Sequence, residues 1–204
     1  MRLLVATRSE GKQREAQRLL RAAGIEALFP DDAGVSPDPA EDGLELGDSF
    51  EANARAKAEY FARRSGLPTV ADDSGLEVLA LGGLPGVRSK RWAAATAGGV
   101  ELDQANNAEL LRRLLGAPPN RRRAGYRCVL AYLAAPGAVP QSFEGRCSGT
   151  ILDAPRGQGG FGYDPLFLSD ELGKTFGEAT DVEKDSVSHR GRAFRLLVQH
   201  LTGG

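Results

Sequence analysis

Several short segments of this sequence gather residue types that could bind a phosphate chain or a cation. The first, residues 7–12, reads Thr-Arg-Ser-Glu-Gly-Lys and joins an apolar run to a helical pattern. A helix N-terminus offers free N–H groups and partial positive charge, and Lys12 would add a full charge, so this segment could bind an anion. The segment lacks the spacing of a P-loop, and the plainer interpretation is that Ser9 caps the helix.

Two adjacent carboxylates, Asp72 and Asp73, form the second group, and Ser74 and Gly75 follow them. The pair comes after a short apolar run, where a strand is expected to end, and α/β sheets bind ligands beyond the carboxyl ends of their strands. Paired carboxylates suit a divalent cation or a general base. The alternative is ordinary turn chemistry, in which an Asp side chain bonds its own backbone.

Asn53 and Lys57 are four residues apart, so they share one face of a predicted helix, either as ligands or as an exposed pair.

Residues 157–165 hold four glycines with interleaved aromatic rings. Such a segment could let the backbone approach a ligand and stack on a base, or it could be a strained loop whose Phe161 fills the core.

Lys184 and residues 188–190 (Ser-His-Arg) precede the last predicted helix. At a helix N-terminus the helix dipole would favour the neutral imidazole of His189. The alternative is a helix cap with surface charges.

The segments that must position these residues alternate between strand and helix patterns. Apolar runs predict strands, and apolar residues three and four apart predict helices, of which one is capped by Ser49 and ends near Ser65. Residues 30–48 are rich in Asp, Glu, Pro and Gly and predict an acidic loop. The expected strands cover residues 3–6, 25–29, 69–71, 126–133 and 142–151, and the expected helices begin after residue 12, at residue 50, at residue 103 and near Ser186 or Ser188. This order predicts a mixed α/β fold.

The composition excludes several classes of protein. The chain has 204 residues, of which 41% are hydrophobic and 26% are charged, with a formal net charge of −1. That length fits a single domain, residues 1–204. The balanced charge argues against a partner that is nucleic acid or membrane, no apolar run reaches the ~20 residues of a membrane helix, and two cysteines cannot build a disulfide framework. We expect a reduced, cytoplasmic protein.

Six motifs follow one another along nearly the whole chain. They are T-x-S-x-G-K from residue 7, S-F-x-x-N-A-x-x-K-A from 49, A-D-D-S-G-L from 71, L-G-G-x-P-G from 81, G-G-F-G-Y-D-P from 159 and E-K-x-x-x-S-H-R-G from 183. In this order they resemble the ITPase-like family of house-cleaning purine nucleoside triphosphate pyrophosphatases, which convert dITP, ITP and XTP to the monophosphate and pyrophosphate. The resemblance implies an elongated two-lobed α/β fold with a mixed sheet and a central substrate cleft, a homodimer, and dependence on Mg²⁺.

The resemblance also implies roles for individual residues. Asp73 would be the general base and a metal ligand, together with Glu45, although Glu41 fits if the chain carries an insertion. The residues expected to bind substrate are Thr7, Arg8, Ser9, Glu10, Gly11, Lys12, Asn53, Lys57, Ser74, Phe161, Gly162, Tyr163, Asp164, Lys184, His189 and Arg190.

Two positions depart from the family pattern. The family usually has Asn where this chain has Ser9, and commonly has Glu where this chain has Ala52. Two other functions remain open from the sequence: a pyrophosphatase of similar fold acting on modified pyrimidine triphosphates, and a noncatalytic nucleotide- or RNA-binding protein. The adjacent Asp72 and Asp73 argue against the second, because a binding protein does not need an acid pair beside an anion site.

Overall fold

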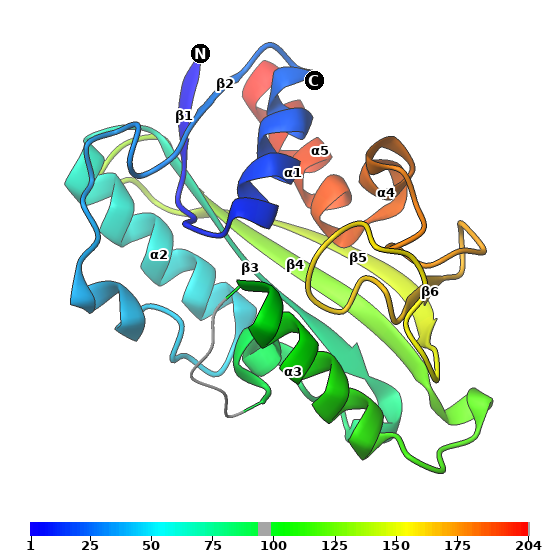
Figure 1. The fold of residues 1–204 in the computed structure, drawn as a ribbon. Coiled ribbons are helices and arrows are strands. Elements are labelled where there is room, and N and C mark those ends of the chain that lie inside the picture. Colours follow the sequence, from blue (N-terminus) through cyan, green and yellow to red (C-terminus); the bar gives the residue numbers. More distant parts are fainter. Residues whose placement is uncertain (94–98, 204) are drawn as a thin grey trace. The chain divides into compact units, whose positions relative to one another are not determined.

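The computed structural model describes residues 1–93 and 99–203, and Figure 1 shows its fold. The strands are β1 (Arg2–Val5), β2 (Glu26–Leu28), β3 (Thr69–Val78), β4 (Arg123–Leu133), β5 (Gln141–Ile151) and β6 (Phe167–Ser169). The α-helices are α1 (Glu10–Arg21), α2 (Phe50–Ser65), α3 (Gly99–Arg113), α4 (Asp181–Val187) and α5 (His189–Thr202). Short 3₁₀ helices are η1 (Pro39–Gly43), η2 (Leu79–Leu81), η3 (Gly86–Arg91) and η4 (Pro119–Arg121).

The strands belong to one mixed sheet in the order β2-β1-β3-β4-β5-β6. Strand β1 pairs in parallel with β2 and with β3, whereas β6 pairs antiparallel with β5. Parallel neighbours need a crossover connection, which α1 and α2 provide. The prediction of a mixed α/β fold is confirmed.

The chain divides into two compact units. Unit 1 comprises Met1–Asp73, Cys128–Gly145 and Arg190–Gly204, and unit 2 comprises Ser74–Arg127 and Arg146–His189. Each unit has its own cluster of buried apolar side chains, and each is described below by itself. That residues 1–204 act as a single domain stays a prediction.

In unit 1, helices α1 and α5 lie side by side (Figure 1) and contribute to one core with three strands. Leu20 of α1 and Leu197 of α5 pack with Leu3 of β1 and Leu130 of β4, and all four are fully buried. The apolar residues 3–5 of β1 are all buried, so this part of the strand is covered on both faces.

In unit 2, the core lies between α3 and the strands. Leu110 of α3 and Leu114, the residue after that helix, pack with Leu76 of β3, Phe167 of β6 and the ring of Tyr126 in β4. These apolar contacts fix α3 on unit 2, which matters below because the same helix also holds a loop of the candidate site.

The structure corrects three local predictions. Strand β3 continues to Val78, so the acid pair lies inside a strand and the turn interpretation of residues 72–75 is wrong. Strand β6 and helix α4 were missed, and Lys184, which lies ahead of the last helix as expected, belongs to α4. The predicted α2 is confirmed, with a Ser49 side-chain cap and Gly66 at φ 71° at its end.

Within the part of the chain that the structure describes, every helix is too short or too polar to span a lipid bilayer.

Candidate active site

Strand β3 carries Asp72 and Asp73 at the end of unit 1, where both are buried, at 5% and 6% exposure. Side chains alternate along a strand, so neighbouring residues point to opposite faces of the sheet. The two carboxylates accordingly have different partners. The hydrogen-bonding partners of the two carboxylates therefore differ, while the charges of Lys12 and Lys57 act on both.

Asp72 lies among cations. Its Oδ2 is 3.0 Å from Lys12 Nζ and 3.0 Å from Arg190 Nη2, and Arg190 Nη1 also binds the buried Glu15 carboxylate of α1. Burial alone would raise the pKa of Asp72, but the charges of Lys12, Arg190 and Lys57 outweigh it and hold that pKa far below its ordinary value. Asp72 is a permanent anion that fixes two cations.

Asp73 lies between the side chains of α2. Asn53 Nδ2 donates to its Oδ2 at 2.8 Å, and Lys57 Nζ is 3.7 Å from Oδ1. Burial raises the pKa of Asp73 above its ordinary value even though Lys57 and Lys12 oppose that shift. The helical spacing of Asn53 and Lys57 therefore places both on the buried face, and the interpretation of them as an exposed pair is wrong.

The ammonium of Lys57 connects Asp73 to the acidic loop. Glu45 Oε1 is 2.6 Å from Lys57 Nζ, which also donates to the backbone oxygen of Asp72. Burial opposes the charge on Lys57, but Glu45 and Asp73 outweigh it, so that its pKa is raised. The result is a buried cation held between two carboxylates.

Glu41, the other candidate metal ligand, has a different environment. Both of its carboxylate oxygens accept from Arg8, at 2.7 Å from Nε and 2.8 Å from Nη2. Arg8 also binds Asp31 and the backbone oxygen of Val35. This bidentate pair belongs to the acidic loop, so the geometry favours Glu45 as the carboxylate that can act together with Asp73.

The donor set fits a magnesium ion held jointly with substrate. Magnesium prefers hard oxygen ligands and typically uses one or two carboxylates plus phosphate oxygens, which Glu45 and Asp73 could supply. Among residues 1–93 and 99–203 no group of three or more His, Cys, Asp or Glu side chains is placed to hold a metal by itself. The residues present therefore fit a site in which substrate oxygens would supply further ligands.

Of the first segment, residues 7–12, Lys12 is the residue whose side chain enters the buried charge network. Ser9 is the N-cap residue of α1, but its side chain makes no capping hydrogen bond, so capping does not explain it. Its N–H instead donates to the Thr7 hydroxyl at 3.2 Å. Glu10 forms an exposed pair with Arg14, and Gly11 is buried.

In unit 2, Asp164 organises the glycine-rich segment. Its Oδ2 accepts from the Phe161 N–H at 2.8 Å and from Lys184 Nζ of α4 at 2.5 Å. Gly160 has φ +71°, and a Cβ there would collide with the Asp164 carboxyl group. The ammonium of Lys184 also lies 4.9 Å from the centre of the Phe161 ring, a cation–π contact.

His189, the first residue of α5, is buried in unit 2. Its ring stacks on Tyr126 with centroids 4.6 Å apart and planes within 7°, and its Nδ1 is 3.9 Å from Cys147 Sγ. Ser74 is the first residue of unit 2. Tyr163 donates from its hydroxyl to the backbone oxygen of Ser89, and burial raises its pKa.

The sequence analysis missed Glu15, Tyr126 and Cys147. Glu15 had a readable signal, because it lies three residues after Lys12 and beside the apolar stripe of α1. The other two had none, since an alternating strand pattern does not tell which aromatic ring or thiol meets His189.

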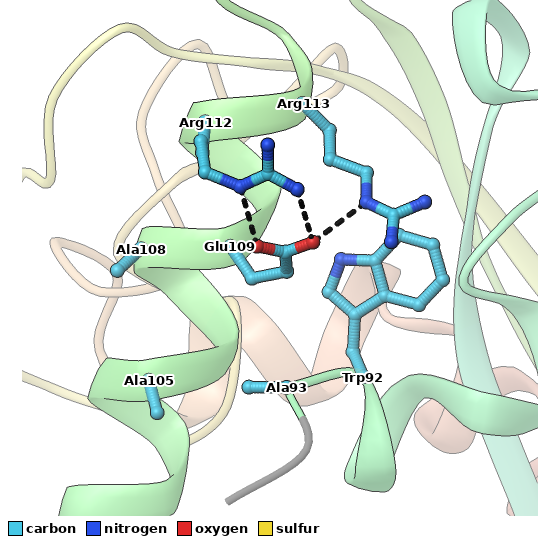
Figure 2. A pocket seen from close by; sticks show the side chains of 7 residues that line it. All are labelled: Trp92, Ala93, Ala105, Ala108, Glu109, Arg112 and Arg113. Atoms are coloured by element: carbon cyan, nitrogen blue, oxygen red, sulfur yellow. Dashed lines mark hydrogen bonds and ion pairs between the residues drawn. The ribbon is translucent and has the colours of Figure 1, made fainter.

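A pocket of about 560 Å³ in unit 2 contains none of the predicted site residues. Figure 2 shows Glu109 of α3 between two arginines, with Arg112 Nε at 2.8 Å and Arg113 Nε at 2.7 Å. The Arg113 guanidinium also lies 4.4 Å from the Trp92 ring centre. These charges pair with one another, so the pocket does not present an obvious anion or cation site. Its lining residues are Trp92, Ala93, Ala105, Ala108, Glu109, Arg112 and Arg113.

The fold and these charge networks define a mixed α/β protein suited to a phosphate chain and its cation. The chain belongs to the Ham1 family, whose model matches residues 3–200. It is 47% identical over 202 residues to a dITP/XTP pyrophosphatase of Frankia alni, covering 98% of this chain and 97% of that protein, and 47% identical over 200 residues to one of Geobacter sulfurreducens, covering 98% and 96%.

Solved structures agree with this assignment. A HAM1 protein from Coxiella burnetii superposes with a TM-score of 0.84 at 34% identity, covering all of both chains. A nucleoside-triphosphatase, named dITP/XTP pyrophosphatase, from Mycobacterium abscessus gives a TM-score of 0.71 at 41% identity, covering 97% of this chain and 98% of that one.

Proposed function

We propose that this protein is a nucleoside triphosphate pyrophosphatase that hydrolyses the deaminated purine nucleotides dITP, ITP and XTP to the monophosphate and pyrophosphate. The relatives named dITP/XTP pyrophosphatase, which match nearly the whole chain, support the substrate class. The observation that carries the chemistry is the buried arrangement of Lys12 and Lys57 around Asp72 and Asp73.

Asp73 is the proposed general base. Asn53 donates to one of its oxygens, which fixes the carboxylate so that the other oxygen, Oδ1, can orient or deprotonate an attacking water at the α-phosphorus. Lys12 and Lys57 stabilise the charge that collects on the pyrophosphate leaving group. Asp72 does not act on substrate but holds Lys12 in place.

Glu45 and Asp73 are the proposed ligands of Mg²⁺, and Lys57 lies between them. When bound, the ion would neutralise the phosphate chain and polarise it toward attack. Lys57 lies close enough to both carboxylates that its ammonium could also donate to a phosphate oxygen bound beside them.

The unit 2 residues are the proposed purine ligands. A 6-oxo purine presents an acceptor where adenine presents an amino donor, so the donors of His189 and Lys184 favour the 6-oxo group. Phe161 can stack on the ring, as aromatic side chains do with bases. Arg190 was also expected to read the purine. Its guanidinium binds Asp72 and Glu15, so we propose that it positions Asp72 instead.

The test is a screen for pyrophosphate release with Mg²⁺ over dITP, ITP, XTP, the four common triphosphates and a methylated pyrimidine triphosphate. We expect release from the deaminated purines at a kcat/KM far above that for ATP. Preference for the methylated pyrimidine would support the rival pyrophosphatase, and tight binding without release would support a noncatalytic nucleotide-binding protein.

The cellular location and the oligomeric state of the protein are also proposals. We infer a cytoplasmic homodimer, as the family resemblance implies, acting on the nucleotide pool. Sedimentation at micromolar concentration would test the dimer directly, and a single species at the monomer mass of 21.6 kDa would contradict it.

A further inference from the structure

Two side chains of helix α3 form hydrogen bonds with the backbone of Gly162. Asp103 Oδ2 accepts the Gly162 N–H at 2.7 Å, and Asn107 Nδ2 donates to the Gly162 carbonyl oxygen at 3.0 Å. Both main-chain polar groups of this glycine, which has φ +63°, are therefore satisfied by side chains of one helix. Gly162 lies between Phe161 and Tyr163 in the proposed purine-binding segment.

Asp103 and Asn107 lie on the same face of the helix as its buried leucines. Asp103, Asn107, Leu110 and Leu114 recur at i, i+4, i+7 and i+11, so they share one face of α3 and its continuation. The leucines are fully buried in the core of unit 2. The residues of the pocket in Figure 2, such as Ala105 and Ala108, lie on a different face of the same helix.

The helix and the glycine-rich segment are both tied to η3. Asn106 of α3 accepts the Ala93 N–H at 2.7 Å and donates to the Lys90 carbonyl oxygen at 3.2 Å. The Tyr163 hydroxyl donates to the Ser89 carbonyl oxygen at 2.8 Å. Gly162, α3 and η3 thus form a closed set of hydrogen bonds, which restrains the segment more than any single bond would.

We propose that Asp103 and Asn107 are positioning residues for purine recognition, acting through the Gly162 backbone on Phe161 and Asp164. This inference rests on the proposed function. Holding Gly162 fixes the Phe161 ring, and it fixes the Asp164 carboxylate that binds Lys184. Lys12 and Lys57, the residues proposed to bind the phosphate chain, belong to helices α1 and α2 of unit 1 and not to this segment.

Two substitutions each remove one of the hydrogen bonds to Gly162, and two matched substitutions keep both bonds. Asp103→Leu removes the acceptor, whereas Asp103→Asn keeps an oxygen that can accept the same bond. Asn107→Asp replaces the donor with an oxygen that repels the carbonyl. Asn107 Oδ1 has no hydrogen-bond partner among the described residues, so this change breaks no other described side-chain hydrogen bond, but it also adds a negative charge four residues from Asp103. Glu101→Ala, at an exposed site of the same helix, is the control.

The experiment measures calorimetric binding of IMP and of pyrophosphate, together with the ITP:ATP ratio of kcat/KM. We expect Asp103→Leu and Asn107→Asp to weaken IMP binding and lower the ratio by about tenfold or more, with pyrophosphate binding within about twofold of wild type. Asp103→Asn and Glu101→Ala should keep both values. If the Asp103→Leu variant does not fold, the Asn107→Asp variant tests the positioning role.

An unchanged ITP:ATP ratio in a folded Asn107→Asp variant would overturn the inference, as would equal losses of IMP and pyrophosphate binding. Failure of the proposed function has a different signature, because the wild-type protein itself would then release no pyrophosphate from ITP.

Discussion

The Arg190 guanidinium binds the Asp72 carboxylate across 118 positions of sequence, with Nη2 3.0 Å from Oδ2. The same guanidinium binds Glu15 through Nη1, so one cation is shared by two buried anions. Burial would lower the pKa of Arg190, but Asp72 and Glu15 raise it, so the charge is permanent. Arg190 is therefore part of the framework of buried charges that holds Lys12 beside Asp72.

Replacing Arg190 with Ala should strongly destabilise the protein, because it leaves two buried carboxylates without their cation. Losing one partner of a buried ion pair costs about 3–5 kcal/mol, measurable by urea unfolding. Glu15→Gln combined with Arg190→Ala should recover part of that loss. If Arg190 instead reads the purine, its Lys variant would change the ITP:ATP ratio while leaving stability near that of wild type.

Asp73→Asn should abolish turnover while the fold stays intact. The change is nearly isosteric, but it removes the proton acceptor and one negative charge from the proposed metal site. Loss of a general base typically costs ~10²–10⁴-fold in rate. Steady-state kinetics at saturating Mg²⁺ are the measurement, with thermal unfolding as a check on folding. Activity within a few-fold of wild type would remove Asp73 from its proposed role.

Glu45→Gln should raise the Mg²⁺ concentration needed for half-maximal activity, whereas Glu41→Gln should not. The two residues are matched in type and lie in the same acidic loop, but Glu41 is bound by Arg8 and Glu45 by Lys57. Even changes outside the first ligand shell typically cost 10–100-fold in metal affinity, so about tenfold is a minimum for Glu45. A magnesium titration in which Glu41→Gln shows the larger shift would reverse the assignment.

Lys12→Ala should impair the handling of the triphosphate. A rise in KM alone would mean that Lys12 contacts the phosphate chain equally in ground and transition states, and a fall in kcat would mean that it serves the leaving group. Ser9→Asn, which restores the usual family residue, should be tolerated with equal or higher activity. An unchanged kcat/KM in Lys12→Ala would show that residues 7–12 are merely a helix start.

His189→Ala should reduce the preference for ITP over ATP more than it slows hydrolysis of a poor substrate. A lost donor to the 6-oxo group corresponds to about 1–3 kcal/mol, or one to two powers of ten in the ratio. His200→Ala, at the exposed end of α5, is the matched control. Equal ratios in both variants and wild type would place purine recognition elsewhere.

The sequence predicted the main elements because their patterns are local. The stripe of α2, its Ser49 cap and its Gly66 end could all be found without tertiary information. Strand β3 was cut short because Asp-Ser-Gly is typical of turns, and its buried acids are stabilised by Lys12, Asn53 and Lys57, which a local pattern does not show. Helix α4 is too short for a periodic signal, although its Thr180–Glu183 capping box was a readable sign.

The site was harder to predict than the fold. The motifs select Lys12, Asp73 and Lys184 as candidates by spacing and family resemblance, and their roles stay predictions. Their mutual geometry depends on contacts between distant segments, such as Arg190 with Glu15 or Asp103 with Gly162. Those contacts follow from packing, and no residue spacing encodes them.

The alternation of Asp72 and Asp73 along β3 has a consequence for how this chain tolerates change in length. A one-residue deletion in the strand ahead of the pair would turn each carboxylate to the opposite face of the sheet. Asp73 would then stand where Asp72 meets Lys12 and Arg190, and Ser74 would stand where Asp73 meets Asn53 and Lys57 of α2. The sequence would still contain Asp-Asp, yet no carboxylate would occupy the position of the proposed base. Variants with such a deletion are expected to be inactive even though the motif survives intact.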